Sequence, residues 1–519
     1  MNPEKKFIVI GLALTAALYV FFLSIPLFGD TLGYGFATTN WIRDNGYTPL
    51  ATGEGRGEQA MGHPTLFFWL WALLSGLLGN TPWVARLLPA VATFLSIWGM
   101  YRLGRLLSCE MAGWLSALAL LASPLFIIQS MRPMPESAVV AAVIWSLFFF
   151  AKKDYIRASI LCALAIAFKE QAVLLAGSLF IAEFIQSGVK KPHRLLLLLS
   201  PILVFFVTGL LNLAANGYFF FPTHIGEGSQ LEPNWLLIRL RLFGIHLISE
   251  DFRWLLVTAA LAGMIRGTGR DTDRRLLPFI LILLFPSLFF PPARIAFLVF
   301  VAALLAVYTI RHRLVLGRLF TAFIMLPVSF VMFHVLIVLI SPDSTMNLFR
   351  YVLPAYPAII LGPMVMLFKY YSRKTAIVIG SIFVVSTAVA NRLQHYDYQS
   401  DTSLACIQPL QDYKEAVLYG VSLEDTMLVS GINRRYYSFP ECGIVESPVP
   451  VRNISSDGQL LEENTYYTLV IASFMDSEGS INISEDILPP GSELRLLSEP
   501  RWDDGRNTVK IFRVEPRIQ

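Results

Sequence analysis

Long apolar runs, separated by short polar segments, recur along the first three quarters of the chain. The first, FIVIGLALTAALYVFFLSIPLF, begins at Phe7, and similar runs continue to about Ala390. A helix needs about 20 apolar residues to cross a bilayer, and it satisfies its backbone hydrogen bonds internally within lipid. The pattern predicts an α-helical polytopic membrane protein. Because the first run is long and lacks a cleavage pattern, we interpret it as a retained span rather than a signal peptide.

The pattern changes near Asp397. A helix is predicted around PLQDYKEAVLYG, and the short alternating runs TMLVSG, YYTLVIASF, ELRLLS and TVKIFRV are typical of strands. We therefore expect a membrane region, residues 1–393, and a small C-terminal α/β domain, residues 394–519. Cys406 and Cys442 fall in the second part. They either form a disulfide in an oxidising outer compartment or remain two buried thiols.

Composition and charge agree with this division. The chain is 55% hydrophobic and 15% charged, which is typical of a membrane protein. Its net charge of +4 does not indicate nucleic-acid binding, because Lys and Arg fall in short clusters between apolar runs. Such clusters mark cytoplasmic loops. They predict about thirteen spans with the N-terminus inside and the C-terminal domain on the extracytoplasmic side of the cell (plasma or inner) membrane.

One apolar run does not fit this alternation. Residues 64–79, PTLFFWLWALLSGLLG, would place Arg102 and Arg105 outside if they crossed the membrane. We therefore place this run in the outer interface or in a re-entrant helix, which its length and aromatic residues permit. The first outer loop is thus expected to hold juxtamembrane helices.

Charged residues gather on the predicted outer face, and charges at membrane depth are rare and usually functional. The set comprises Asp30, His63, Arg132, Glu136, Lys169, Glu170, Arg294, Arg350 and the loop from Asn216 to Asp251. Each has a simpler interpretation as well. Asp30 is then a helix cap or an interfacial charge, Glu136 a structural partner of Arg132, and Lys169 a side chain that extends to the interface.

The motifs that hold these residues occur in an order that resembles the dolichyl-phosphate-mannose protein mannosyltransferase family. That family includes the bacterial lipid A aminoarabinose transferase and belongs to the GT-C superfamily. Its pattern has an acid after the first span, a Lys-Pro-Pro-Leu-x-x-Trp helix, and Ala-Arg-Leu before the second span. The counterparts here are Asp30, His63 to Trp69, and Gly79 to Leu87; MRPMPES, FKEQ and RYVLPAYP match later motifs. His63 replaces the family's Lys, Glu136 its usual Asp, and Pro64-Thr65 its double proline.

The resemblance implies a GT-C fold and transfer of a sugar from a polyprenyl phosphate, such as undecaprenyl phosphate, to an acceptor hydroxyl. His63, Lys169, Arg350 and Tyr351 suit the donor phosphate, joined by Arg239 or Arg241 of the long outer loop. Asp30 is the expected general base, which predicts inversion at the anomeric carbon. Glu136 either orients the acceptor or the Asp30 loop, or acts as the nucleophile of a retaining mechanism.

No cofactor is expected. The sequence has no nucleotide-binding glycine loop and no His/Cys cluster with zinc spacing. A divalent cation held by Asp30 and Glu136 is the less favoured alternative. The expected partners are the lipid-linked donor, a glycan, lipid or protein acceptor, and membrane lipids. Two other classes of function stay open: a transporter or flippase for a lipid-linked or anionic substrate, and a non-catalytic receptor built around the C-terminal domain.

Overall fold

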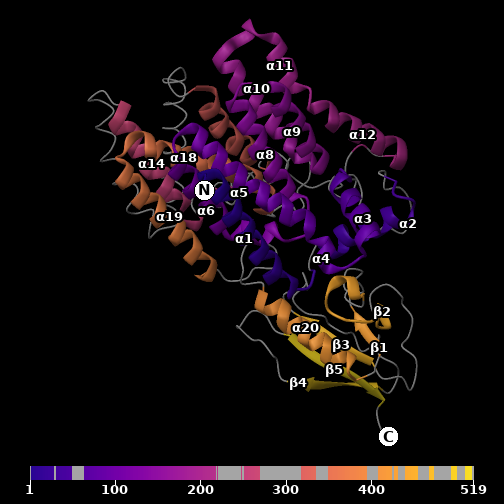
Figure 1. The fold of residues 1–519 in the computed structure, drawn as a ribbon. Coiled ribbons are helices and arrows are strands. Elements are labelled where there is room, and N and C mark those ends of the chain that lie inside the picture. The colour runs from indigo at the N-terminus through magenta and orange to yellow at the C-terminus, as the bar shows by residue number, and fades with distance from the viewer. Residues whose placement is uncertain are drawn as a thin grey trace, which may run out of the picture.

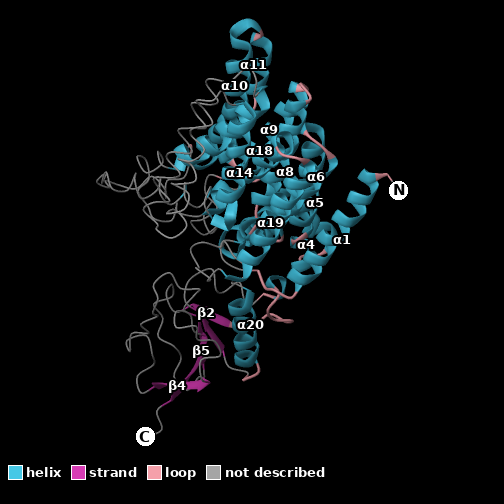
Figure 2. Cartoon of the chain, turned by 90° about the vertical axis from the view of Figure 1, so that its left-hand side faces the viewer, coloured by secondary structure: helices cyan, strands magenta, loops and turns pink. Residues whose placement is uncertain are grey.

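The computed structural model of the 519-residue chain is a helical bundle with a small sheet at one end (Figure 1). The structure describes residues 2–27, 31–48, 63–217, 219, 243, 247, 250–268, 317–334, 349–393, 407–423, 426–429, 439–453, 467–472, 492–498 and 509–516. In both views the sheet and α20 (Ile407–Val421) lie at the end of the molecule opposite α10 (Val173–Ser187) and α11 (Pro192–Leu199) (Figures 1 and 2).

The helices follow the apolar runs of the sequence. In the first part of the chain they are α1 (Pro3–Leu23), η1 (Thr31–Phe36), α2 (Ala37–Asp44), α3 (Leu66–Leu78), α4 (Pro82–Ala85), α5 (Leu87–Leu107), α6 (Glu110–Ala122), α7 (Pro124–Ser130), α8 (Glu136–Ala151), α9 (Tyr155–Phe168), η3 (Glu170–Ala172), η4 (Gly188–Lys190) and α12 (Ile202–Asn216). Later elements are η6 (Glu250–Phe252), α14 (Arg253–Thr268), Gly317–His334, η9 (Phe349–Ala355), α18 (Tyr356–Tyr370) and α19 (Arg373–Leu393).

The chain is a multi-pass membrane protein. Among the described residues, seven helices are long and apolar enough to cross a bilayer, or eight if the bent pair α6 and α7 forms one span. The expected total of about thirteen remains a prediction, because residues 269–316 and 335–348 lie outside the described part. α3 is an apolar helix of only 13 residues, shorter than the roughly 20 that a span needs. This length agrees with the interfacial or re-entrant helix expected for residues 64–79.

α8 lies at the centre of the bundle. It is apolar on nearly all sides and almost entirely buried, as expected of a helix surrounded by other helices. α5 and α9 pack against it, and α5 also packs against α6. One large apolar cluster joins these helices to α14 and α18. The central position of α8 explains why its first residue, Glu136, is surrounded by other elements.

Two glycines allow α5 and α6 to approach closely. A Cβ atom built on Gly104 would lie 2.8 Å from the Cα of Gly113, and one on Gly113 would clash with the carbonyl oxygen of Tyr101. Overpacking of such a contact typically costs about 1–3 kcal/mol. We therefore expect Gly113→Ala to lower the midpoint of thermal unfolding in detergent. Gly177→Ala, in α10 with no atom within 4 Å of the added methyl, is the matched control; equal midpoints for the two variants would contradict this packing.

A polar cluster joins several helices at the end of the bundle that holds α10 and α11. The hydroxyl of Tyr155 donates to Glu183, and the guanidinium groups of Arg194 and Arg318 each donate to the Tyr155 oxygen. Both arginines lie within 4 Å of the buried Glu183 carboxylate. This end carries the basic residues that the sequence assigns to the cytoplasm, so the cluster ties α9, α10, α11 and Gly317–His334 together there.

The C-terminal residues form a five-stranded sheet in the order β2-β1-β3-β5-β4. β1 (Thr426–Val429) pairs in parallel with β2 (Val451–Asn453) and β3 (Tyr467–Ala472). β5 (Val509–Pro516) is antiparallel to β3 and to β4 (Ser492–Ser498). Four of these strands and α20 are at the predicted positions; β2 was missed because it has only three residues. The expected boundary at residue 393/394 stays a prediction, since residues 394–406 are outside the described part.

The C-terminal part packs against the loop that follows α1. The amide of Leu27 donates to the carbonyl oxygen of Cys442 over 2.9 Å. Phe22 of α1, Trp71 of α3 and Tyr413 of α20 belong to one buried cluster. The two segments therefore lie at the same end of the bundle. Burial raises the pKa of the Cys442 thiol, and the proposed disulfide stays untested because Cys406 is outside the described residues.

Candidate functional site

A helical hairpin brings Glu136 and Lys169 together. Glu136 is the first residue of α8, Lys169 directly follows α9, and the short turn at residues 152–154 joins the two helices. Because the helices are similar in length and antiparallel, the start of one lies beside the end of the other. The Lys169 ammonium donates to Oε1 of Glu136 over 2.6 Å. The two residues that the sequence separates by two apolar runs thus form a direct ion pair.

Arg350 and Tyr351 reach the same point from η9, far along the chain. The Nε atom of Arg350 lies 3.4 Å from Oε1 of Glu136. The ammonium of Lys169 lies 4.3 Å from the ring centre of Tyr351, and the Arg350 guanidinium lies 5.4 Å from it. Both cations therefore share one carboxylate oxygen and one aromatic ring. We call Glu136, Lys169, Arg350 and Tyr351 the cation cluster.

The cation cluster is buried. The exposed fraction is 1% for Glu136, 3% for Arg350, 7% for Lys169 and 9% for Tyr351. Charged side chains are rarely buried to this extent unless they are paired. The helix ends add to the pairing, because the start of α8 favours the Glu136 carboxylate and the end of α9 favours the Lys169 ammonium. Within this cluster, two cations share one carboxylate.

His63 lies next to this cluster through Glu170. Its Nδ1 atom is 3.1 Å from Oε2 of Glu170, the residue that follows Lys169 and begins η3. The ring of Tyr34, from η1, packs edge to face with His63 at a distance of 5.1 Å. Five of the expected site residues are therefore carried by adjoining elements: His63, Glu136, Lys169, Arg350 and Tyr351. Glu170 was named in the outer-face set without a role, and its contact with His63 has no signal in the sequence.

The surroundings of Glu136 favour some of its expected roles over others. Among the described residues its ion pairs are with Lys169 and Arg350 rather than with Arg132, so the simple Arg132 partnership is not found. A carboxylate held by two cations and almost inaccessible is a weak nucleophile. This geometry suits a residue that positions the two cations, and it disfavours a covalent glycosyl-enzyme at Glu136.

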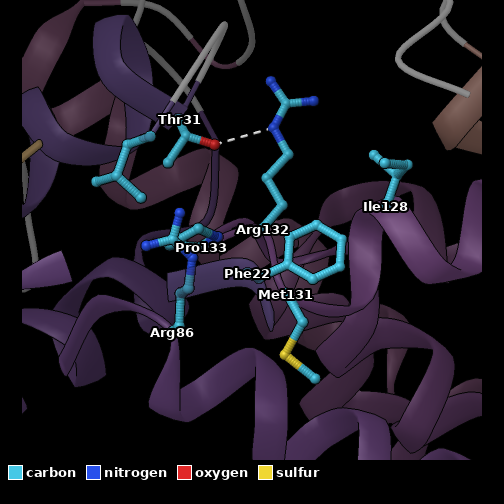
Figure 3. Close-up of a pocket in the computed structure, with 8 residues that line it drawn as sticks. Phe22, Thr31, Arg86, Ile128, Met131, Arg132 and Pro133 are labelled. Carbon is cyan, nitrogen blue, oxygen red and sulfur yellow. Dashed lines mark hydrogen bonds between the residues drawn. The ribbon is translucent and has the colours of Figure 1, made fainter. Parts of the chain in front are cut away.

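Asp30, Arg239 and Arg241 lie outside the described residues, so their expected roles stay predictions. The residue after Asp30 is among the described residues. Thr31 Oγ1 accepts a hydrogen bond of 2.9 Å from Nε of Arg132 (Figure 3). Arg132 is in the turn that leads directly into Glu136. The chain on one side of Asp30 is therefore fastened to the segment that carries the cation cluster.

Arg86 was part of the matching motif, but the sequence assigned it no role. A small pocket, lined by Phe22, Leu27, Thr31, Arg86, Ile128, Met131, Arg132 and Pro133, lies between the ends of α1 and α7 (Figure 3). Arg86 is 2% exposed and donates to the carbonyl oxygens of Ile25 and Pro82. It therefore joins the end of α1 to α4, and so supports the chain that precedes residue 28.

The described residues contain no group of three or more His, Cys, Asp or Glu side chains placed to hold a metal ion. Since Asp30 lies outside them, the alternative of a cation held by Asp30 and Glu136 is untested. The cation cluster itself offers ammonium, guanidinium and phenol groups, which bind phosphate oxygens directly. What this arrangement can do is hold an anionic phosphoryl group.

Comparison with known proteins agrees with these features. Residues 62–211 match the family described as dolichyl-phosphate-mannose-protein mannosyltransferase. The crystal structure of ArnT from Cupriavidus metallidurans bound to undecaprenyl phosphate matches with 13% identity and a TM-score of 0.52, covering 98% of each chain. Its apo structure matches with 13% identity, a TM-score of 0.53 and the same coverage. A sequence search of curated proteins finds no significant match.

The class is thus a multi-pass membrane protein with the fold of ArnT. The family match and the shared fold confirm the resemblance drawn from the motifs. The match over residues 62–211 and the fold of ArnT agree with the GT-C glycosyltransferase type that the motifs resemble.

Proposed function

We propose that the protein transfers a sugar from a polyprenyl phosphate to an acceptor hydroxyl at the outer face of the membrane. The observation that carries this proposal is the buried cation cluster, in which Lys169 and Arg350 converge on one carboxylate oxygen beside Tyr351. A lipid-linked phosphate carries the negative charge that such cations bind. The partial match to a mannosyltransferase family supports the same reaction class.

The cation cluster stabilises the leaving group. When the bond between the anomeric carbon and the phosphate oxygen breaks, the electron pair stays on the phosphate, whose negative charge grows. Lys169 and Arg350 are fixed donors aimed at such charge, and fixed donors in a buried site act more strongly than donors in water. Tyr351 adds a phenol beside them. Glu136 holds both cations in place by its shared carboxylate oxygen, so it acts as a positioning residue.

Asp30 is the proposed general base. The acceptor hydroxyl attacks the anomeric carbon from the side opposite the phosphate, and its proton passes to the Asp30 carboxylate. This single displacement inverts the configuration. The anchoring of Thr31 by Arg132 supports the role, because it holds the neighbouring residue to the segment that leads into Glu136.

The setting of the reaction follows from the charge pattern. The distribution of basic residues at the ends of the apolar runs supports a location of the cation cluster and the C-terminal sheet on the extracytoplasmic side of the plasma or inner membrane. The backbone hydrogen bond from Leu27 to Cys442 supports a location of the first loop and the C-terminal part on the same side of the membrane. We propose that this part faces the acceptor, which is a lipid, a glycan or a protein.

Transfer in detergent tests the proposal against the transporter alternative. The purified protein is supplied with a polyprenyl-phosphate-linked sugar and a panel of hydroxyl acceptors, and the products are followed by mass spectrometry. We expect a glycosylated acceptor and free polyprenyl phosphate in equal amounts, with inverted anomeric configuration. A transporter needs two compartments and yields no product in detergent, so an unchanged donor with every acceptor would count against transfer.

A further inference from the structure

His63 and Glu170 form a pair that the reaction scheme leaves without a purpose. The imidazole Nδ1 is 3.1 Å from the Glu170 carboxylate, and the exposed fractions of the two side chains are 19% and 15%. The ring is held against Tyr34 on another side. A carboxylate next to a phosphate site repels the phosphate unless a positive charge cancels it. The presence of Glu170 beside Lys169 therefore needs an explanation.

Charge balance makes the site sensitive to one proton. In the described part of the site, the cation cluster carries one excess positive charge, from Lys169 and Arg350 against Glu136. Glu170 cancels that charge when His63 is neutral. When His63 is protonated, the excess positive charge returns. Histidine is the side chain whose ordinary charge change falls near physiological pH, so the net charge offered to a phosphate depends on pH.

The geometry directs the imidazole as well. A protonated imidazole donates from both ring nitrogens, which point away from each other. With Nδ1 occupied by Glu170, Nε2 is directed away from that carboxylate. A carboxylate partner on one nitrogen fixes the orientation of the ring. Among the described residues, Glu170 and Tyr34 of η1 contact the His63 ring, and Lys169 acts on the Glu170 carboxylate.

We propose that Glu170 is a positioning residue that orients the His63 ring, so that the Nε2–H of the protonated imidazole contacts the donor phosphate and donor binding takes up one proton at His63 wherever the free ring is neutral. This rests on the proposed function, because it assigns the phosphate of a polyprenyl-phosphate donor to the cation cluster. The Glu170 carboxylate, which alone would repel the phosphate, thereby supports protonated His63 as the third cation of the site.

Binding of undecaprenyl phosphate to the full-length protein in detergent tests this between about pH 5 and pH 8. Phosphate monoesters also ionise near pH 6, which changes affinity independently of His63. The lysine in His63→Lys stays charged over this pH range, so this variant reports the ionisation of the phosphate alone. Relative to His63→Lys, the wild type is expected to lose affinity about tenfold as the pH rises, which is the typical worth of one charge-assisted hydrogen bond. His193→Lys, at an exposed histidine of α11, should leave the wild-type profile unchanged.

Glu170→Gln separates this role from a structural one. Glutamine still accepts a hydrogen bond from Nδ1 but carries no charge, so the loss of affinity is expected at lower pH than in the wild type. In the His63→Lys background the same substitution should leave the shape of the profile unchanged. Parallel profiles for wild type and His63→Lys, or identical profiles for wild type and Glu170→Gln, would overturn the inference. Absence of binding in every variant at every pH would overturn the donor assignment with it.

Discussion

The Asp30→Asn protein is expected to lose sugar transfer by about 10²- to 10⁴-fold, the usual contribution of general acid–base catalysis. Asparagine has nearly the same shape as aspartate but does not take the proton of the acceptor hydroxyl. The loss should appear in the rate of transfer at saturating donor. Binding of undecaprenyl phosphate should stay within a few-fold of the wild type, because the cation cluster and His63 are intact.

Asp44→Asn is the matched control for this substitution. Asp44 lies at the end of α2 in the same loop, is largely exposed, and pairs only with the adjacent Arg43 among the described residues. It should retain wild-type transfer. An active Asp30→Asn protein would reject the general-base role, while leaving the phosphate-binding role of the cation cluster to be judged separately.

Lys169→Met is expected to weaken both donor binding and transfer, the latter by about 10²- to 10³-fold, as found when one fixed donor to a developing charge is removed. Methionine keeps the length and apolar stem of lysine but not the ammonium. Because Glu136 would then keep Arg350 as its remaining partner, we expect the free energy of unfolding to fall by about 3 kcal/mol, the lower end for breaking a buried ion pair.

Stability and chemistry must therefore be measured on the same samples. Thermal unfolding in detergent and the elution profile identify folded protein, on which undecaprenyl phosphate binding and transfer are then determined. Lys190→Met, at an exposed lysine of η4, is the control. If Lys169→Met protein that remains folded bound undecaprenyl phosphate as tightly as the wild type, the cation cluster would not be the donor phosphate site.

The pattern of apolar and polar positions was sufficient for much of the fold. Helices need long apolar runs in lipid, so the membrane region and the short helix at residues 66–78 could be expected from the chain. Alternation of apolar and polar residues likewise predicted four of the five strands of the C-terminal part. The positions of Glu136, Lys169 and Arg350 at the ends of such runs likewise marked them as one set, because charges seldom occur there without a partner.

Only the tertiary structure decided how these charges are paired. The sequence left Glu136 open as a nucleophile, a partner of Arg132 or an orienting residue, whereas packing of α8 between α5 and α9 places it against Lys169 and Arg350. The contact of His63 with Glu170 joins residues 107 positions apart. Apolar periodicity reports which residues enter the membrane, but the choice of partner among buried charges depends on distances of a few ångströms between helices, and these are set by how the helices pack.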